Sequence, residues 1–316
     1  MNSYLEGLLY ANFQNYWDYI DLDTLLTLQK PLTDFPDEVV FITYHQITEL
    51  YFKLTLHEIE QIAGNGHVIL DNGKIGGWNE RLDPLFFTER LKRMNRYFDN
   101  LIESFDVLVS GMEKDQFLKF RMALLPGSGF QSLQFRKIEI ASTDLHLLTH
   151  NGANETGTKK GINTDFESRF ENMYWKKGAV ELSSGNRTLT STQFEKKYSV
   201  DLLAFAKTYS EKNLRAKYRS LPESAKKNSS LIRELRQWDV KVNINWPLAH
   251  YKSAVKHLHR DAEYIKATGG TNWQKYLPPR FQMKVFYPEL WSEKEKNDWG
   301  KEWVEETMSE IKPGKS

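Results

Sequence analysis

The stretch FITYHQITELYFK, residues 41–53, is the most informative segment of this 316-residue chain. Apolar residues in and around it recur at steps of three and four, which places them on one face of an α-helix. They are Val40, Tyr44, Ile47, Tyr51 and Leu54. Phe41, His45 and Phe52 lie on a neighbouring stripe, so an imidazole sits among aromatic rings. We expect a buried helix that runs to about Ile62, in which His45 is either a core side chain bonded to a backbone carbonyl or a functional group.

The charges of the chain balance almost completely, with 43 basic and 42 acidic residues and a net charge of +1. This balance gives no electrostatic reason to expect binding to nucleic acid or to an anionic membrane surface. The sequence contains no cysteine, which excludes disulfides, iron–sulfur clusters, thiolate-ligated haem and Cys-based zinc sites. Aromatic residues make up 13% of the chain, which suits either a large core or an aromatic ligand pocket.

Targeting and membrane-spanning segments are not apparent in the sequence. The N-terminus MNSYLEGLLYANFQNYW lacks the basic region and the long apolar core of a signal peptide. No stretch approaches the ~20 apolar residues that a membrane-spanning helix needs. We therefore expect a cytoplasmic protein that does not enter a membrane.

Helical spacing dominates the rest of the chain, and strand-type alternation is almost absent. Residues 150–200 are rich in Asn, Gly, Ser, Thr and Lys, which predicts a long irregular excursion on the surface. The fold class is predicted to be all-α, with residues 1–316 forming one large helical domain and residues 1–30 forming an aromatic-rich arm. Further helices are predicted at residues 22–29, 84–111, 114–124, 130–142, 200–218 and 228–260.

The eight histidines form no recognisable metal-binding motif, and the HExxH signature of zinc proteases is absent. His146 and His150 have helix-face spacing but no third ligand nearby, so core or surface positions are favoured over a metal site. His257 and His259 stand among charged residues, which predicts a solvated helix end. His250 differs because it begins an apolar run, although by itself it is compatible with an ordinary buried histidine.

Arg121 lies on the aromatic stripe of its predicted helix, beside Phe117. The loop PGSG, residues 126–129, follows it and leads into a new helix, so free backbone N–H groups come close to the guanidinium in sequence. An arginine offers two parallel donors to a carboxylate, and a helix N-terminus adds positive potential. These residues predict a carboxylate-binding site, with an internal salt bridge from Arg121 to Glu139 or Glu49 as the alternative.

Several segments, in the same order along the chain, resemble the tryptophan 2,3-dioxygenase family, the haem enzymes that open the pyrrole ring of L-tryptophan. The resemblance spans about residues 16–290 and is poor over residues 150–235. SGFQSLQFR is the most specific run, and HQxxEL is nearly as specific. The matching segments are 16–23 (YWDYIDLD), 28–31 (LQKP), 41–53 (FITYHQITELYFK), 120–121 (FR), 126–136 (PGSGFQSLQFR), 246–250 (WPLAH) and 268–270 (TGG).

The resemblance implies a heme b cofactor (iron protoporphyrin IX), ferrous in the active form, in a pocket within the core of the helix bundle. His250 matches the proximal histidine, which places a neutral imidazole nitrogen on the iron. His45 matches the distal histidine, which hydrogen-bonds the indole N–H and is the expected catalytic residue. Ser128 matches a pocket serine near the haem.

The resemblance also implies how the substrate is held. Arg121 is similar to the arginine that pairs with the substrate carboxylate, and Thr268 to the threonine that contacts the amino-acid end. Phe41 is expected to pack on the indole ring. Phe117 stands where members of the family carry either Tyr or Phe, so a phenol contact to the carboxylate is missing here.

The aromatic arm also matches the family. Tyr16 and Tyr19 occupy aromatic positions that, in the family, reach into a neighbouring subunit's pocket. The resemblance therefore implies a homo-oligomer, expected to be a homotetramer, with L-tryptophan and O₂ as the substrates.

The expected reaction inserts both atoms of O₂ across the indole C2–C3 bond of L-tryptophan and gives N-formyl-L-kynurenine, the first step of the kynurenine route of tryptophan degradation. Two segments depart from the family pattern. Pro247 stands where an arginine usually follows the tryptophan, and the loop ATGGTNW, residues 267–273, replaces the common GTGGSSG. Two alternatives therefore stay open: a related haem enzyme for a modified indole or another aromatic amino acid, and a non-catalytic haem- or ligand-binding protein.

Overall fold

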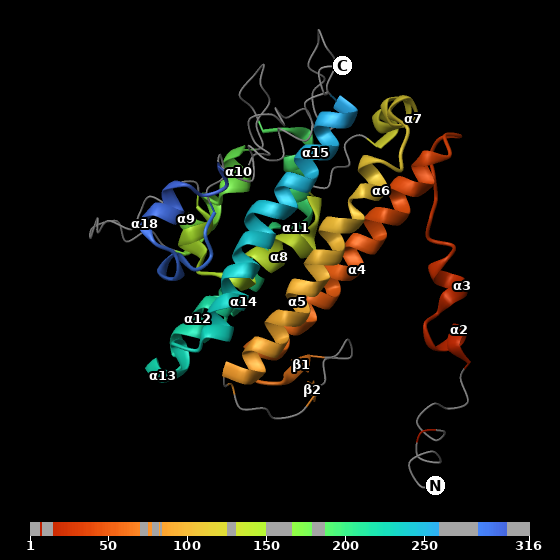
Figure 1. Cartoon of the computed structure of the whole chain (residues 1–316). Helices are drawn as coiled ribbons and strands as arrows, with labels where there is room; N and C mark the ends of the chain where they lie inside the picture. Colours follow the sequence, from red (N-terminus) through yellow and green to blue (C-terminus); the bar gives the residue numbers. More distant parts are fainter. Residues whose placement is uncertain are drawn as a thin grey trace, which may run out of the picture.

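The computed structural model describes residues 7, 15–69, 75–77, 82, 84–124, 131–149, 166–178, 187–258 and 284–301. Within these ranges the chain is helical apart from turns, loops and one short antiparallel hairpin, so the prediction of an all-α fold is confirmed. The hairpin pairs β1 (His67–Ile69) with β2 (Ile75–Gly77). The long helices, labelled in Figure 1, are α4 (Asp37–Ala63), α5 (Pro84–Ser104), α8 (Leu133–Ser142), α11 (Leu189–Tyr209), α14 (Ser229–Val240) and α15 (Trp246–Leu258).

Shorter helices connect and cover the long ones. Those at the N-terminal arm and around the upper end of the bundle in Figure 1 are α2 (Tyr16–Tyr19), α3 (Leu22–Leu25), α6 (Asp106–Val109), α7 (Lys114–Phe120) and the 3₁₀ turn η1 (Arg121–Leu124). The others are η3 (Leu145–Leu148), α9 (Phe166–Glu171), α10 (Tyr174–Gly178), α12 (Leu214–Ser220), α13 (Glu223–Lys226), η6 (Pro288–Leu290) and α18 (Glu293–Asn297).

Helix α4 forms where the sequence predicts it and ends one residue beyond Ile62, at Ala63. Glu38 in its first turn folds back, and its carboxylate accepts hydrogen bonds from the backbone N–H groups of Leu32 and Thr33, each at 2.8 Å. The helix ends in a turn where Gly66 has a φ of 90°, a conformation that glycine adopts without steric cost.

The buried face of α4 differs from the face predicted from the sequence. Tyr44 is buried, but Ile47 and Leu54 are 42% and 45% exposed. Val39 and Leu50 are exposed on the same side of the helix. The side chains that enter the core are Tyr44, Thr48, Phe52, Thr55, Ile59 and Ile62. An apolar row therefore remains on the outer side of α4.

The core is built mainly from aromatic contacts between helices. Helix α5 packs against both α4 and α14, and α8 packs against α4 and α11. The ring of Phe98 lies edge-on to Trp238 of α14 at 4.8 Å, and Phe52 of α4 meets Trp246 of α15 at 5.7 Å. One hydrophobic cluster thus joins the long helices, with Trp246 close to its centre.

Helices α14 and α15 form one continuous rod that is interrupted by a π-helical turn at Lys241–Asn245. Pro247 explains this interruption, because a proline has no N–H to donate and its ring clashes with the carbonyl four residues earlier in a regular helix. The N–H of Trp246 bonds to the carbonyl of Lys241, which widens the turn just before the proline. The π-turn therefore lets the rod continue towards His250.

The prediction of an irregular excursion over residues 150–200 is wrong for the residues that the structure describes. Helices α9 and α10 occupy residues 166–178, and α11 begins at Leu189 rather than near Val200. Phe194, Leu202 and Tyr209 of α11 are buried, which is why a segment of polar composition is helical. No helix within the described ranges is both long enough and apolar enough to cross a membrane.

Candidate active site

His45 is fixed by its own helix. Its Nδ1 lies 2.7 Å from the carbonyl oxygen of Phe41, one turn earlier in α4. A carbonyl oxygen can only accept, so Nδ1 carries the proton and Nε2 is left as the basic nitrogen. Burial lowers the pKa of the His45 imidazole, although the Phe41 carbonyl and Glu49 act in the opposite direction. The ring is therefore neutral at physiological pH, with an acceptor at Nε2.

His250 is fixed in the same way on α15. Its Nδ1 lies 3.0 Å from the carbonyl oxygen of Trp246, again one turn earlier, which leaves Nε2 with a lone pair. Burial, with a smaller contribution from His45, lowers the pKa of His250 to about 4, although the hydrogen bond to the Trp246 carbonyl acts in the opposite direction. His250 is therefore held in the neutral form that binds metals.

Aromatic side chains connect the two imidazoles. Phe105, at the start of α6, packs its ring 4.6 Å from His250 and 5.6 Å from Tyr44, the residue before His45. Trp246 lies edge-on to His250 at 4.5 Å. On the other side of His45, the ring of Phe41 lies at 4.1 Å. The two imidazoles of the site are thus set in an apolar, aromatic wall.

The wall continues through α7. Phe41 contacts Phe117 at 6.3 Å and Phe120 at 5.8 Å, and Phe117 reaches His257 of α15 at 5.1 Å. The prediction of a solvated helix end at His257 is wrong: the residue is 1% exposed, and its Nε2–H donates to the carbonyl of Leu108 at 2.8 Å. Its Nδ1 is buried without a hydrogen-bond partner.

Arg121 follows Phe120 directly, so its backbone lies at the edge of this wall. The side chain is buried, and burial lowers the pKa of the guanidinium. The two acids proposed as salt-bridge partners of Arg121 also bind other groups. Glu139 bonds to Arg136 and Lys284, and Glu49 accepts from Gln134 at 2.8 Å. The role of Arg121 in binding a carboxylate stays a prediction.

The remaining predicted site residues are less informative. Ser128 and Thr268 lie outside the described residues. Tyr16 and Tyr19 are 71% and 78% exposed on α2, where they make no contribution to the wall within their own chain. Phe105 and Trp246 were missed as site residues, because nothing in the local sequence separates them from ordinary core aromatics.

The donors of the site fit a haem better than a bare metal ion. In the described part of the chain, no three His, Asp or Glu side chains come together as a metal-binding group. A haem needs only one axial protein ligand and an apolar surrounding, and His250 offers a neutral Nε2 next to Phe105 and Trp246. His45 offers a second neutral imidazole, which would be able to accept a hydrogen bond from a molecule bound in the site.

Comparison with known proteins is consistent with this geometry. A family model described as tryptophan 2,3-dioxygenase matches residues 9–148. The chain is similar to the tryptophan 2,3-dioxygenase of Bacillus thuringiensis subsp. konkukian (strain 97-27), with 27% identity covering 88% of this chain and 90% of the relative. The proteins of the same name from Ruegeria sp. (strain TM1040) and Pseudomonas fluorescens are 28% and 29% identical, each over 90% of this chain and 92% of the relative.

Proposed function

We propose that this chain is an enzyme of the tryptophan 2,3-dioxygenase family, to which it is similar along most of its length, and that it inserts both atoms of O₂ across the indole C2–C3 bond of L-tryptophan. The product is N-formyl-L-kynurenine. The observation that carries the proposal is the pair of neutral imidazoles, His45 and His250, each tied through Nδ1 and each left with a basic Nε2 beside one aromatic wall.

His250 is the proposed ligand of the haem iron. The hydrogen bond from Nδ1–H to the Trp246 carbonyl fixes the tautomer and the ring orientation, and it raises the basicity of Nε2. When bound, ferrous heme b supplies the iron that binds and activates O₂ for insertion into the indole ring. Phe105 and Trp246, whose rings contact His250, would give the ligand an apolar surrounding.

His45 is the proposed partner of the indole N–H. Because its Nδ1–H is already donated to the Phe41 carbonyl, Nε2 is free to accept a hydrogen bond from an N–H group. Phe41, whose ring packs against this imidazole, would support the indole face. The chain thereby orients the substrate, which is a large part of what a binding site contributes to rate.

Arg121 is the proposed partner of the substrate carboxylate. A guanidinium binds a carboxylate with two parallel hydrogen bonds, and a largely apolar surrounding strengthens the pair. Thr268 and Ser128 are assigned, by family resemblance, to the amino-acid end and to the haem side. Charge gathered at one end and aromatic surface at the other suit a zwitterionic amino acid with an indole side chain.

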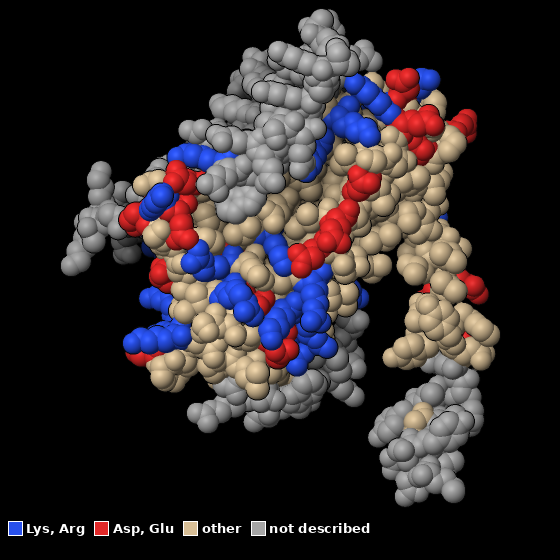
Figure 2. Space-filling model, viewed as in Figure 1, with Lys and Arg blue, Asp and Glu red and all other residues tan. Residues whose placement is uncertain are grey.

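A homo-oligomer, a tetramer by family resemblance, completes the proposal. The arm exposes Tyr16, Tyr19, Leu26 and Leu28, and Figure 2 shows its surface to be mostly uncharged. Large apolar groups in such a number are costly in water unless another surface covers them. The exposed row on α4 provides a second apolar surface, so we infer that residues 1–30 dock on a neighbouring copy of one haem-dioxygenase-like domain, residues 1–316.

The test uses the full chain reconstituted with haem and reduced to the ferrous state. Addition of L-tryptophan and O₂ should produce N-formyl-L-kynurenine. The product is measured by its near-ultraviolet absorbance and identified by its mass. A parallel sample of His250→Ala carried through the same reconstitution is the control. Haem-loaded protein that shifts its absorption with L-tryptophan but forms no product would favour a related enzyme or a binding protein.

A further inference from the structure

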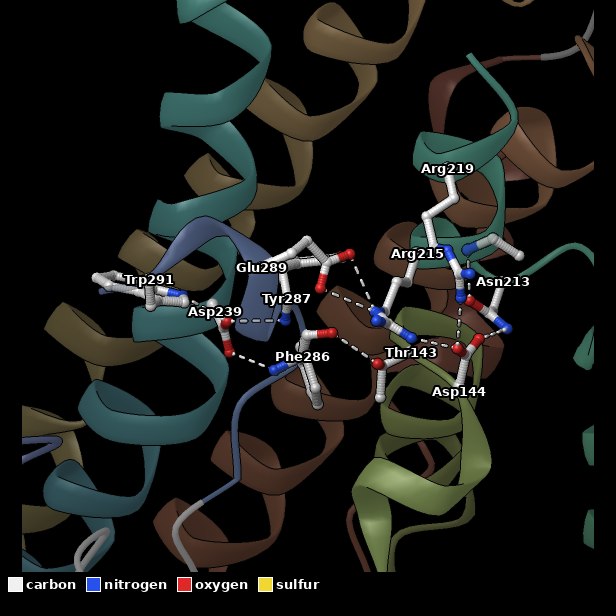
Figure 3. A network of polar contacts seen from close by, with 11 residues as sticks. Thr143, Asp144, Asn213, Arg215, Arg219, Asp239, Phe286, Tyr287, Glu289 and Trp291 are labelled. Atoms are coloured by element: carbon white, nitrogen blue, oxygen red, sulfur yellow. Dashed lines mark hydrogen bonds and ion pairs between the residues drawn. The ribbon is translucent and has the colours of Figure 1, made fainter. Parts of the chain in front are cut away.

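Asp239, at the C-terminal end of α14, is a fully buried carboxylate that is held by neutral groups. Oδ1 accepts from the side-chain amide of Asn243 and from the backbone N–H of Phe286, both at 2.8 Å. Oδ2 accepts from the backbone N–H of Tyr287 at 3.1 Å and from the indole N–H of Trp291 at 3.0 Å. Figure 3 shows the carboxylate between its helix and the segment that carries these donors.

That segment, residues 284–291, is called here the C-terminal strap. Besides Asp239, it is tied to two other helices, α8 and α12. Thr143 donates to the carbonyl of Phe286 at 2.6 Å, Arg215 donates to Glu289 at 3.1 Å, and Lys284 pairs with Glu139. The strap is thus fixed across α8, α12 and α14, and Asp239 provides its bonds to the rod formed by α14 and α15 (Figure 3).

The strap covers the face of the rod that lies opposite His250. Ile244 and Leu248 form a small apolar cluster with Val285 of the strap and with Trp299. Leu248 and His250 are two residues apart on α15, which places them about 200° apart around the helix. The strap therefore contacts the same stretch of the rod that carries His250, on the other side of the helix.

The rod needs such support at this place. The π-turn has a widened hydrogen-bond pattern, and Pro247 offers no N–H to the turn before it. The carbonyl of Trp246, which orients His250, belongs to the first turn of α15, directly after this weakened turn. Asp239 holds Asn243 inside the π-turn and the strap outside it, so one carboxylate joins both parts.

We propose that Asp239 is a positioning residue for His250: by clamping the strap to the π-turn, it sets the direction of the Trp246 carbonyl and hence the orientation of the imidazole. The inference rests on the proposed role of His250 as the haem ligand. It assigns a task to a buried charge that would be costly to retain for packing alone, since burying a carboxylate without a cation is unfavourable.

The test compares two carboxylate-to-amide changes, each of which removes one attachment of the strap, in the full haem-loaded chain. Asp239→Asn keeps the side-chain volume but turns one acceptor into a donor that faces the donating N–H groups. Glu289→Gln removes the strap's ion pair with Arg215 and leaves Asp239 and the π-turn untouched. The readouts are the iron–histidine stretching band of the ferrous protein by resonance Raman and the rate of haem loss to an acceptor protein.

Asp239→Asn should shift or broaden the iron–histidine band and speed haem loss by about tenfold, the lower end of the effect of partners that orient a metal ligand. Glu289→Gln should leave the band unchanged. Equal thermal destabilisation of both variants with an unshifted band in Asp239→Asn would overturn the proposal, because a merely structural clamp would behave in this way.

If Asp239→Asn does not fold, Trp291→Phe replaces it, since it removes one donor to Asp239 and keeps an aromatic ring. A smaller shift in the same direction supports the proposal, and an unchanged band overturns it. The proposed function fails separately: a His250→Ala variant that still binds haem would refute the ligand assignment, whatever happens at Asp239.

Discussion

His250 and His257 lie on the same face of α15, two turns apart, and their imidazoles are tied in opposite ways. His250 uses Nδ1 to bond a carbonyl of its own helix, whereas His257 uses Nε2 to bond the Leu108 carbonyl at the end of α6. The first arrangement leaves Nε2, the nitrogen farther from the backbone, for a ligand. The second uses Nε2 to join two helices. Which ring nitrogen forms the hydrogen bond therefore distinguishes the candidate ligand, His250, from the structural histidine, His257.

The largest expected effect comes from removing the imidazole of His250. His250→Ala should abolish stoichiometric haem binding, because it removes the only axial ligand that the proposal contains. The measurement is the haem content after reconstitution, with His257→Phe treated in parallel. Haem retained by His250→Ala and lost by His257→Phe would reverse the assignment of the two histidines.

Next in size is the effect of Arg121, which lies near the His257 half of the wall. Arg121→Ala should weaken L-tryptophan binding by about 2–5 kcal/mol, the cost of removing one partner of a buried charge pair. Binding of an indole that has no carboxylate should change little, and this ligand is the matched control. An equal loss for both ligands would mean that Arg121 shapes the pocket rather than holding the carboxylate.

His257→Phe should affect stability rather than haem. The change keeps an aromatic ring against Phe117 but leaves the buried Leu108 carbonyl without its donor, at a cost of about 1–3 kcal/mol. Denaturant unfolding of the wild type and the variant measures this difference. An unchanged free energy of unfolding would show that the bond from α15 to α6 contributes nothing.

The smallest expected effect is the pH dependence of stability at Asp239, which holds the strap against the rod that carries His250. Burial raises the pKa of Asp239 to about 6, against four hydrogen bonds that lower it; Tyr287 is its titratable neighbour, and Arg215 and Glu289 lie beyond. The folded protein therefore holds this proton more tightly than the unfolded chain does. The contribution of this proton to stability is complete below the unfolded pKa of 3.8 and is lost as the pH rises through about 6.

Asp239→Asn cannot titrate, so the stability advantage of the wild type over this variant should be larger near pH 5 than near pH 7.5. The expected difference is on the order of 1 kcal/mol. Denaturant unfolding of both proteins at the two pH values measures it. An advantage that is constant, or that grows with pH, would contradict the raised pKa.

The contacts that are local in sequence could be predicted, and the non-local ones could not. The α4 helix, its end near Ile62 and the position of His45 among aromatic rings follow from spacing along one helix, as does the aromatic setting of Arg121. The burial of His257 could not be foreseen, because it depends on α6 and α7 packing against α15. The clamp at Asp239 joins residues almost 50 positions apart, and no local pattern announces it.

Two errors have identifiable physical causes. Composition suggested a loop near residues 189–199, although Phe194, Tyr198 and Leu202 already carry the helical spacing that buries α11. On α4, apolar residues surround the helix, so spacing alone could not tell which row meets the core and which row stays exposed. The exposed row is the part of the sequence pattern that a neighbouring subunit would explain.

The most direct test of the central claim is the fate of labelled oxygen. The haem-loaded ferrous protein is given L-tryptophan under ¹⁸O₂ in unlabelled water, and the product is examined by mass spectrometry. Our account predicts N-formyl-L-kynurenine that carries two labelled oxygen atoms in most molecules, allowing for slow exchange of carbonyl oxygen with water. Product that acquires one labelled atom or none at the earliest times, or conversion of L-tryptophan to another compound, would contradict it.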